Sequence, residues 1–479
     1  MPDALLTAER LVRRFARSTN LLVAGRTFDV VGEDEVADEL RELLSRLGAR
    51  LGQGSVVFAP GSTTEILLNG DALPWRATAD ERIDFAGVHM PVSRGIADAL
   101  REAGTVRGIR IGIAMVLEPK TAQLALLLRA AGADVAVYAH PDEIDPEVAA
   151  ALRARGIPVD GNPALSGAAE RDAAVAFLRR GLDLLLDDGS HLIRLAHEQD
   201  ALGDLRGAAE ETTSGLTPLR RMVAEGALRI PVIAVNDAPM KTAFDNRYGT
   251  GQSCVFAVAD VLDTAGISVR DQPAVVIGYG PVGEGVAAHL RALGATVGVT
   301  ETDPVRALRA AHDGYVTGHL RDLAPGALVI SATGAPHTID AETLRVAEIV
   351  AVAGGVPGEV DVDVAALRPV ERAGAVLPHL ASAGDGGLLV ARGGCVNLAA
   401  AEGNPIEIMD LSFAVQLSAV AQLLASPLPA GVHPFPAEAD QAVARAALAV
   451  RHEDVDVRSD AQRLAQDDWR SPRYREATA

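Results

Sequence analysis

The chain has 479 residues, of which 48% are hydrophobic, and its formal net charge at pH 7 is −20. A chain of this length is expected to fold into two or three domains, and its negative charge argues against nucleic acid and anionic membrane as partners. Only two cysteines, no signal-peptide pattern and no apolar run long enough to cross a bilayer occur, so we expect a cytoplasmic protein without a disulfide framework or a metal site.

Residues 1–85 give the fewest signals. Leu and Val recur at three- and four-residue spacing in residues 4–17 and 35–47, which predicts two helices. Residues 62–77 alternate around Asn69-Gly70-Asp71, which predicts a hairpin. This stretch contains no catalytic constellation, and we interpret it as an N-terminal extension with a structural or oligomerisation role.

From Met90 onward, short apolar strands alternate with helices. The predicted strands are residues 109–114, 134–138, 157–159, 182–186 and 232–235, and the predicted helices are residues 121–131, 146–155, 168–180 and 215–225. Such alternation is typical of a parallel, doubly wound α/β sheet.

A second α/β unit follows. A β-branched run leads into Gly278-x-Gly280-x-x-Gly283, a predicted helix comes next, and a strand over residues 296–300 ends at Glu301. This is the pattern of a dinucleotide-binding unit, and its structural alternative is a tight strand-to-helix turn. The glycines let the backbone approach a pyrophosphate. Glu301 would bind the adenosine ribose and repel a 2′-phosphate, so NAD is favoured over NADP.

The dinucleotide unit continues through two strands that end in small residues, at 328–334 and 349–355. We therefore predict an α/β fold with two doubly wound parallel-sheet domains. One of them is a Rossmann domain for NAD, and an N-terminal extension and a C-terminal tail flank the pair.

Polar residues gather at the ends of three predicted strands, where open α/β sheets place ligands. Asp187 and Asp188 follow one strand, a polar segment from Glu211 to Ser214 follows another, and Lys241 and Asp245 stand four residues apart after a third. Each cluster has a structural alternative: a turn or cap for the aspartates, an N-cap for the second segment, and a surface ion pair of little energetic value for the third.

In combination these motifs resemble the S-adenosylhomocysteine hydrolase family, and the chain is identified as a divergent member of it. The matching segments are Leu186-Asp187-Asp188-Gly189, Glu210-Glu211-Thr212-Thr213, residues 236–248, 278–285, 300–304 and 311–315, and Val396-Asn397-Leu398. The resemblance runs from about Met90 to the C-terminus and leaves the first 85 residues outside it.

The resemblance implies that bound NAD oxidises the 3′-hydroxyl of a nucleoside to a ketone. The ketone acidifies the 4′-proton, the 5′-substituent departs, water adds to the 4′,5′-alkene, and NADH reduces the ketone again. Carried over by position, Lys241 is the base for the 3′-hydroxyl, Asp245 and Glu211 hold the ribose hydroxyls, and Asp188 transfers protons near C4′ and C5′. Asn246, which would help to seat the nicotinamide, completes the implied catalytic set.

The resemblance also implies binding residues. The cofactor contacts would be Thr212, Thr213, Ser214, Gly278, Gly280, Pro281, Val282, Gly283, Glu301, Thr333, Gly334, Asn397, Arg470 and Tyr474. The substrate contacts would be Glu118, Lys120, Thr121, Asn236, Thr250 and Asn404. Arg470 and Tyr474 lie in a tail that closes over a neighbouring subunit's NAD in the family, so a homo-oligomer, a tetramer by resemblance, is expected.

The same resemblance divides the chain into four parts. Residues 1–85 form the extension, 86–250 with 404–436 a substrate-binding domain, 251–403 the Rossmann NAD-binding domain, and 437–479 a tail for oligomerisation and cofactor covering.

The departures from the family pattern fall together. Val116, Gly355 and Asn404 stand where the family has histidine, Thr250 stands at its active-site cysteine, Glu118 replaces threonine and Lys120 replaces glutamate. The residues for ribose oxidation are kept, whereas those that handle the 5′ group, water and base are changed. This pattern favours 3′-oxidation of a nucleoside with a different 5′ substituent.

We therefore predict an NAD-dependent hydrolase or lyase that acts by 3′-oxidation and 4′,5′-elimination, for instance a dehydration that stops at the exocyclic alkene. Two alternatives stay open. One is hydrolysis of S-adenosylhomocysteine to adenosine and homocysteine, and the other is a non-catalytic NAD-binding homologue that regulates a partner.

Overall fold

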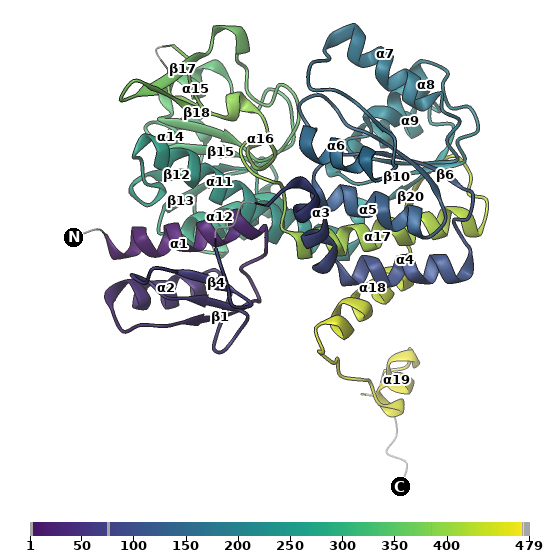
Figure 1. Ribbon diagram of the computed structural model, residues 1–479, viewed down its shortest axis with the longest axis horizontal. Coiled ribbons are helices and arrows are strands. Elements are labelled where there is room, and N and C mark those ends of the chain that lie inside the picture. The colour runs from purple at the N-terminus through teal and green to yellow at the C-terminus, as the bar shows by residue number, and fades with distance from the viewer. Residues whose placement is uncertain (1–2, 74–76, 385, 472, 474–479) are drawn as a thin grey trace.

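The computed structural model describes residues 3–73, 77–384, 386–471 and 473 (Figure 1). Its strands form a small N-terminal sheet, a seven-stranded sheet and an eight-stranded sheet. Strands alternate with helices along most of the chain, and the two larger sheets are mostly parallel. The predicted α/β fold with doubly wound parallel sheets is confirmed.

The N-terminal unit joins two helices to a mixed sheet. Its elements are α1 (Ala4–Thr19), β1 (Thr27–Val30), α2 (Glu35–Arg46), β2 (Arg50–Leu51), β3 (Val56–Phe58), β4 (Ile66–Leu68) and β5 (Asp71–Ala72), with the strands in the order β2-β1-β3-β4-β5. Both predicted helices and the predicted hairpin, in which Leu68 pairs with Asp71, are confirmed. Phe15, Phe28 and Phe58 are buried against one another and form the core of this unit.

The seven-stranded sheet is entirely parallel. It contains β6 (Arg110–Ala114), β7 (Asp134–Tyr138), β8 (Val159–Asp160), β9 (Leu184–Asp187), β10 (Gly207–Glu210), β11 (Pro231–Ala234) and β20 (Gly431–Pro434), in the order β20-β11-β10-β9-β6-β7-β8. The helices between and beside these strands are α3 (Ala79–Val88), α4 (Pro91–Ala103), α5 (Pro119–Ala130), α6 (Pro146–Ala154), α7 (Gly167–Leu178), α8 (His191–Glu198) and α9 (Thr213–Ala224). Because β20 pairs with β11, the chain returns to this sheet after completing the next one.

The eight-stranded sheet contains the dinucleotide unit. Its strands are β12 (Pro273–Ile277), β13 (Thr296–Thr300), β14 (Val316–Thr317), β15 (Leu328–Ser331), β16 (Ile349–Val352), β17 (Arg368–Arg372), β18 (Ala375–Ser382) and β19 (Leu388–Val390), in the order β14-β13-β12-β15-β16-β19-β18-β17. Its helices are α12 (Pro281–Ala292), α13 (Pro304–His312), α14 (Leu320–Leu323) and α15 (Ala341–Val346). In this sheet β18 pairs antiparallel with both β17 and β19, and β19 pairs in parallel with β16.

Two connections join the larger sheets, and the N-terminal unit bonds to both. The first is α10 (Pro239–Lys241), the π-helix η2 (Thr242–Gly249) and α11 (Thr250–Ala265), and the second is α16 (Val396–Ala399) and α17 (Ile406–Ala425). The Gln252 side chain accepts a hydrogen bond from the Val23 N–H at 2.8 Å. The Ile406 N–H donates to the Asn20 carbonyl at 2.9 Å. The extension is therefore built into the joint between the two sheets.

α17 is the one helix in the described parts of the chain that is long and apolar enough to cross a membrane. However, 56% of its apolar window is buried inside the protein, where it packs against α4 and η2, as a core helix does. After β20 the chain continues through α18 (Ala437–Val450) and α19 (Asp460–Asp467).

Candidate active site at the joint between the two sheets

The predicted catalytic residues lie at the carboxyl edge of the seven-stranded sheet. Asp188 follows β9, Glu211 follows β10 and Asn236 follows β11, and these three strands are neighbours in the sheet. Lys241 ends α10, and Asp245 lies in the π-helix η2 that follows it. π-Helical turns are rare and are found frequently at functional sites.

Lys241 is the centre of a buried cluster and only 2% exposed. Its Nζ lies 2.8 Å from Asp245 Oδ2, 3.0 Å from Asn246 Oδ1 and 3.4 Å from Asn236 Oδ1. Glu211 Oε1 is 4.0 Å away. The structure thus brings together four of the five predicted catalytic residues, together with Asn236, and the ion pair between Lys241 and Asp245 is a buried one.

The carboxylates control the charge of Lys241. Burial lowers the pKa of Lys241, but the nearby Asp245 and Glu211 carboxylates outweigh burial and hold the pKa above its ordinary value. Burial raises the pKa of Glu211 to about 7, although Lys241 opposes the rise.

Hydrogen-bonded amides link this cluster to the second connection. Asn404 Nδ2 donates to Asp245 Oδ1 at 2.7 Å and to Thr250 Oγ1 at 3.2 Å. Asn404 Oδ1 accepts from Ser253 Oγ at 2.8 Å and from Asn397 Nδ2 at 3.0 Å. Asn404 therefore orients Asp245, and it cannot carry a proton near neutral pH.

Glu211 has two partners that sequence reasoning missed. Ser412 Oγ donates to Glu211 Oε1, and Gln416 Nε2 donates to Glu211 Oε2 at 2.6 Å. Both residues are fully buried on α17, four positions apart and hence on one face of the helix. The sequence could have indicated this contact, because two polar residues four positions apart interrupt an otherwise apolar helix.

The two neighbouring aspartates differ in role. Asp187 is fully buried, and its carboxylate accepts hydrogen bonds from the Ile193 N–H at 2.8 Å and the Asp188 N–H at 3.1 Å, which fits the capping alternative. Asp188 is half-buried. Burial raises the pKa of the Asp188 carboxyl, and the positive charges of Lys241 and His140 oppose that rise.

The segment after β10 also has a clear structural role. Thr212 is the N-cap of α9, and its hydroxyl donates to Glu210 Oε1 at 2.7 Å. Thr213 and Ser214 stand in the first turn of α9. This geometry fits the N-cap alternative for Thr212, and cofactor contacts by the three hydroxyls stay predictions.

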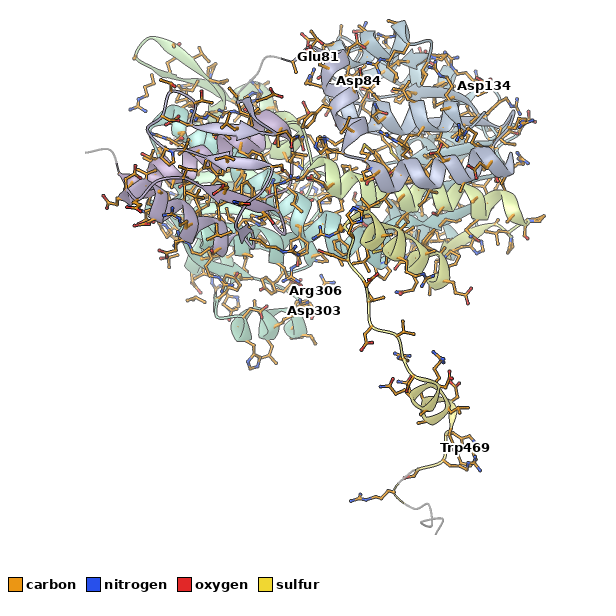
Figure 2. The ribbon with its side chains drawn as sticks, turned by 60° about the horizontal axis from the view of Figure 1, so that its bottom comes forward. Glu81, Asp84, Asp134, Asp303, Arg306 and Trp469 are labelled. Carbon is orange, nitrogen blue, oxygen red and sulfur yellow. The ribbon has the colours of Figure 1, made fainter. Side chains whose placement is uncertain are left out.

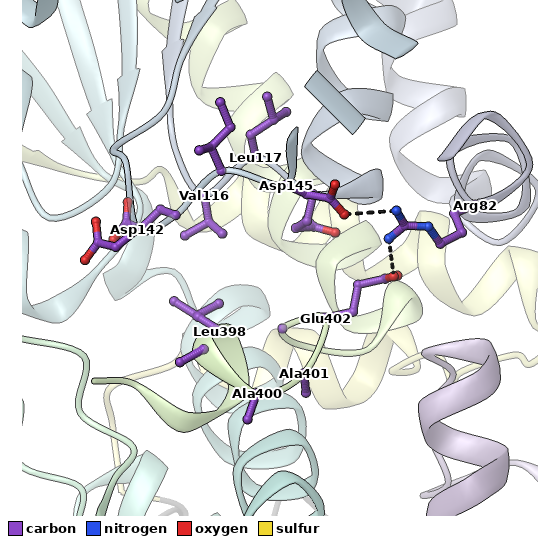
Figure 3. Close-up of a pocket in the computed structure, with 14 residues that line it drawn as sticks. Arg82, Val116, Leu117, Asp142, Asp145, Leu398, Ala400, Ala401 and Glu402 are labelled. Atoms are coloured by element: carbon purple, nitrogen blue, oxygen red, sulfur yellow. Dashed lines mark hydrogen bonds and ion pairs between the residues drawn. The ribbon is translucent and has the colours of Figure 1, made fainter. Parts of the chain in front are cut away.

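A cavity of about 440 Å³ opens between the loops after β6 and β7 and the loop before α17 (Figure 3). Lys241 and its partners are not among the residues that line it. Val116 and Glu118 line it from one side, and Leu398 and Glu402 line it from the other. Arg82 joins the two walls, because its guanidinium donates to Asp145 and Glu402 at 2.9 Å each.

Three of the predicted substrate residues lie at the cavity wall or directly behind it: Glu118, Lys120 and Thr121. Glu118 lines the cavity and caps α5, and its Oε2 lies 2.6 Å from Lys120 Nζ. Lys120 is 1% exposed and also donates to the Glu402 carbonyl at 2.7 Å. Thr121 is buried and donates to Glu118 Oε1 at 3.3 Å. Lys120 and Thr121 therefore hold the wall in place.

The glycine loop before α12 has the shape that a pyrophosphate requires. Gly278 has φ of 90°, a conformation that favours glycine, and a Cβ on Gly283 would collide with the Gly278 carbonyl oxygen. Pro281 and Val282 begin α12 beside Gly280. The backbone cradle and helix N-terminus fit the phosphates of NAD.

Glu301 is held as an anion at the end of β13. Its carboxylate accepts hydrogen bonds from the backbone N–H groups of Tyr279 at 2.7 Å, Thr302 at 2.7 Å and Asp303 at 3.0 Å. Burial raises the pKa of Glu301, but these N–H groups outweigh burial and keep the pKa below its ordinary value. A fixed negative charge here fits a ribose diol and repels a 2′-phosphate.

Two further predicted cofactor residues follow β15. Thr333 Oγ1 lies 2.8 Å from Thr338 Oγ1 and donates to Glu359 Oε1 at 3.2 Å. Gly334 has φ of 60°. The structure places both at the same edge of the sheet as the glycine loop, because β15 pairs in parallel with β12.

The C-terminal tail extends away from its own chain's cofactor residues. Figure 2 shows Trp469 far from Asp303 and Arg306, and Trp469 is 90% exposed. Arg470 pairs only locally in this arrangement, with Asp468 at 2.9 Å. Tyr474 lies outside the described residues. A role in covering cofactor stays a prediction for both Arg470 and Tyr474.

Comparison with known proteins identifies the family to which the chain is similar. Residues 246–403 match the family model described as S-adenosyl-L-homocysteine hydrolase, NAD binding domain. The chain is 36% identical over 408 residues to the adenosylhomocysteinase of Thermococcus kodakarensis, covering 82% of this chain and 95% of the relative. It is 37% identical over 402 residues to the adenosylhomocysteinase of Archaeoglobus fulgidus, covering 81% and 98%. It is 35% identical over 402 residues to the S-inosyl-L-homocysteine hydrolase of Methanothermobacter thermautotrophicus, covering 81% and 96%.

Proposed function

The chain belongs to the S-adenosylhomocysteine hydrolase family and uses NAD as its cofactor, and from that premise we propose that it oxidises the 3′-hydroxyl of a nucleoside and eliminates a 5′ group other than homocysteine. The observation that carries the proposal is that the cluster around Lys241 is intact. The positions where the family pattern has histidines for the chemistry at C5′ hold Val116, Gly355 and Asn404 instead.

Each residue of the cluster has a task in this reaction. NAD, held by the glycine loop and Glu301, supplies the hydride acceptor at C3′. Lys241 removes the proton of the 3′-hydroxyl, and Asp245 and Glu211 accept hydrogen bonds from the ribose hydroxyls. Asn246 and Asn397 help to seat the nicotinamide end. Asp188 takes the proton from C4′ once C3′ is a ketone.

The proton-transfer requirements support a different 5′ group. Val116, on the cavity wall, has no group that can transfer a proton. The Asn404 amide, which donates to Asp245, cannot transfer one near neutral pH either. Loss of a general acid–base group typically slows a reaction by about 10²–10⁴-fold. Hydrolysis of S-adenosylhomocysteine, the second candidate, should therefore be slow, although the overall identity to adenosylhomocysteinases favours it.

We propose further that the chain forms a homotetramer and that its domains have separate binding roles. Residues 86–250 with 404–436 bind the nucleoside, residues 251–403 bind NAD, and the tail from residue 437 covers the cofactor of a neighbouring subunit in a homotetramer.

The test is incubation of the NAD-loaded protein with adenosine, inosine and S-adenosylhomocysteine, with NADH absorbance and products followed together. NADH formation by a nucleoside supports the proposal, and its absence with all three would favour the non-catalytic homologue. Rapid thiol release from S-adenosylhomocysteine would establish the ordinary hydrolase instead.

A further inference from the structure

A histidine pair lies beside the loop that carries Asp188. His140 follows β7, and His191 begins α8 directly after that loop. Their rings lie edge to face with centroids 5.2 Å apart. A Cβ on Gly189 would collide with the His191 ring, so this ring rests on the residue that follows Asp188. The two histidines therefore bring the end of β7 next to the loop after β9.

His140 has the partner that a proton-transferring histidine needs. Its Nδ1 lies 3.1 Å from Glu170 Oε1 on α7. A carboxylate at Nδ1 requires a proton on that nitrogen, so Nε2 is left to gain and lose the transferred proton. The His140 side chain is 23% exposed, and Asp142 and Glu143 on the same loop line the cavity. His140 is thus oriented by Glu170 and partly exposed, and it lies two residues before the cavity-lining Asp142.

Three polar groups stand after alternate strands at the carboxyl edge of the seven-stranded sheet. Lys241 comes after β11, Asp188 after β9 and His140 after β7, in a sheet ordered β11-β10-β9-β6-β7. Alternate strands are separated by about 10 Å, a span that side chains and a nucleoside cover together. The charges of Lys241 and His140 both act on Asp188. Lys241 and His140 therefore stand on opposite sides of Asp188 along this edge, with the loop after β6 between Asp188 and His140.

We propose that His140, oriented by Glu170, is the catalytic acid that protonates a departing 5′-hydroxyl oxygen, which makes a 5′-hydroxyl nucleoside the substrate class. This inference rests on the proposed function. On the 3′-ketone, Asp188 removes the C4′ proton, the released electron pair forms the C4′–C5′ double bond, and the C5′–O bond breaks. The oxygen leaves with that bond's electron pair, takes the proton from His140 Nε2 and departs as water.

The chemistry of the leaving group favours oxygen over sulfur. A thiol has a pKa of about 8.5, so a departing thiolate depends on protonation less than a departing hydroxide does. Bulk water has a pKa of about 15.7, so hydroxide is a poor leaving group and has to be protonated as it departs. A dedicated acid at C5′ is therefore of most use for a hydroxyl.

His191 and the other charged groups around His140 position it. Burial, His140 and Arg194 lower the pKa of His191 to about 4, so His191 is neutral and is not the acid. His140 contacts Glu170 from α7, His191 from α8 and Tyr138 at the end of β7. It also interacts electrostatically with Asp188, Arg194 lies against His191, and Asp142 and Glu143 follow on its own loop. Because the acid form of His140 is required, water loss should be slower at high pH.

The test compares His140→Gln, Glu170→Gln and the control His312→Gln, which lies exposed at the end of α13. Each NAD-loaded protein is given adenosine in deuterated water, and NADH absorbance, deuterium at C4′ and alkene formation are followed. His140→Gln should keep NADH formation and C4′ exchange but lose alkene formation by about 10²–10⁴-fold. Glu170→Gln should shift the pH profile of alkene formation, and His312→Gln should change nothing. Thiol release from S-adenosylhomocysteine should fall less than tenfold in His140→Gln.

The outcomes separate this inference from the proposed function. If wild-type protein forms NADH and alkene and His140→Gln forms alkene at the same rate, the assignment of His140 is wrong while the proposed function stands. If the wild-type protein forms no NADH with adenosine or inosine, the proposed function itself fails. Should His140→Gln not fold, an unchanged pH profile in Glu170→Gln would overturn the assignment.

Discussion

Replacing Lys241 by methionine tests the buried cluster most sharply, because methionine keeps an unbranched side chain, one atom shorter, and removes the charge and the hydrogen-bond donors. In the native protein the ammonium lies 2.8 Å from Asp245 and 4.0 Å from Glu211. The variant leaves both carboxylates buried without a cation.

The expected loss of stability follows from that geometry. Removing one partner of a buried ion pair costs about 3–5 kcal/mol, because the other charge stays buried and unpaired. For a unit of about 200 residues, 1 kcal/mol corresponds to about 2–4 °C, so the thermal midpoint should fall by roughly 6–20 °C at pH 8. The loss should be smaller at pH 5, since Glu211, whose pKa burial raises to about 7, then binds a proton and loses its charge.

The matched control is Lys241→Met combined with Asp245→Asn, which removes the charge of the nearer carboxylate as well. The double variant should recover several degrees of the lost midpoint, and neither variant should form NADH at more than about one hundredth of the wild-type rate. Thermal unfolding and NADH absorbance provide the two readouts. A double variant less stable than the single one, or NADH formation by Lys241→Met near the wild-type rate, would refute the role of the cluster.

Three further results are expected. Glu301→Gln should weaken NAD binding and admit NADP, as measured by equilibrium titration, and unchanged selectivity would contradict the assignment of this carboxylate. Burial raises the pKa of Asp187 and of Glu143 to about 8 each, so between these values and the ordinary ones the folded protein holds protons that the unfolded chain releases. The thermal midpoint should therefore fall as the pH rises from 5.5 to 8.5, and a rising midpoint would contradict this. Deleting the residues after Asp468 should release NAD and reduce the mass of the assembly in light scattering, and a truncated protein that keeps both would argue against a shared site.

The sequence predicted the larger sheets well because their strands are apolar, regular and separated by helices with clear periodicity. Of the small N-terminal sheet it predicted the hairpin of β4 and β5 but not β1, β2 and β3, which are two to four residues long and too short to show alternation. Its contacts at Asn20 and Val23 with the joint between the larger sheets also have no local signal, because their partners lie more than 200 residues away.

The site was predictable wherever one motif carried several of its residues. The spacing of Lys241 and Asp245 predicted their contact, although the backbone there is π-helical rather than α-helical. Sequence alone could not separate the capping role of Asp187 from the position of Asp188, because both follow the same buried strand. The contact between His140 and His191 depends on how two distant loops meet, and a comparison with the family pattern at Val116, Gly355 and Asn404 could not reveal it.

The central claim is that the oxidation of the 3′-hydroxyl is retained while the chemistry at C5′ has changed. Its most direct test is one experiment in which the NAD-loaded protein meets a 5′-hydroxyl nucleoside or S-adenosylhomocysteine, with NADH absorbance and thiol release recorded together. We predict NADH formation and loss of water with the 5′-hydroxyl nucleoside, and little thiol release from S-adenosylhomocysteine. Efficient thiol release, with no NADH formed from the 5′-hydroxyl nucleoside, would contradict the account.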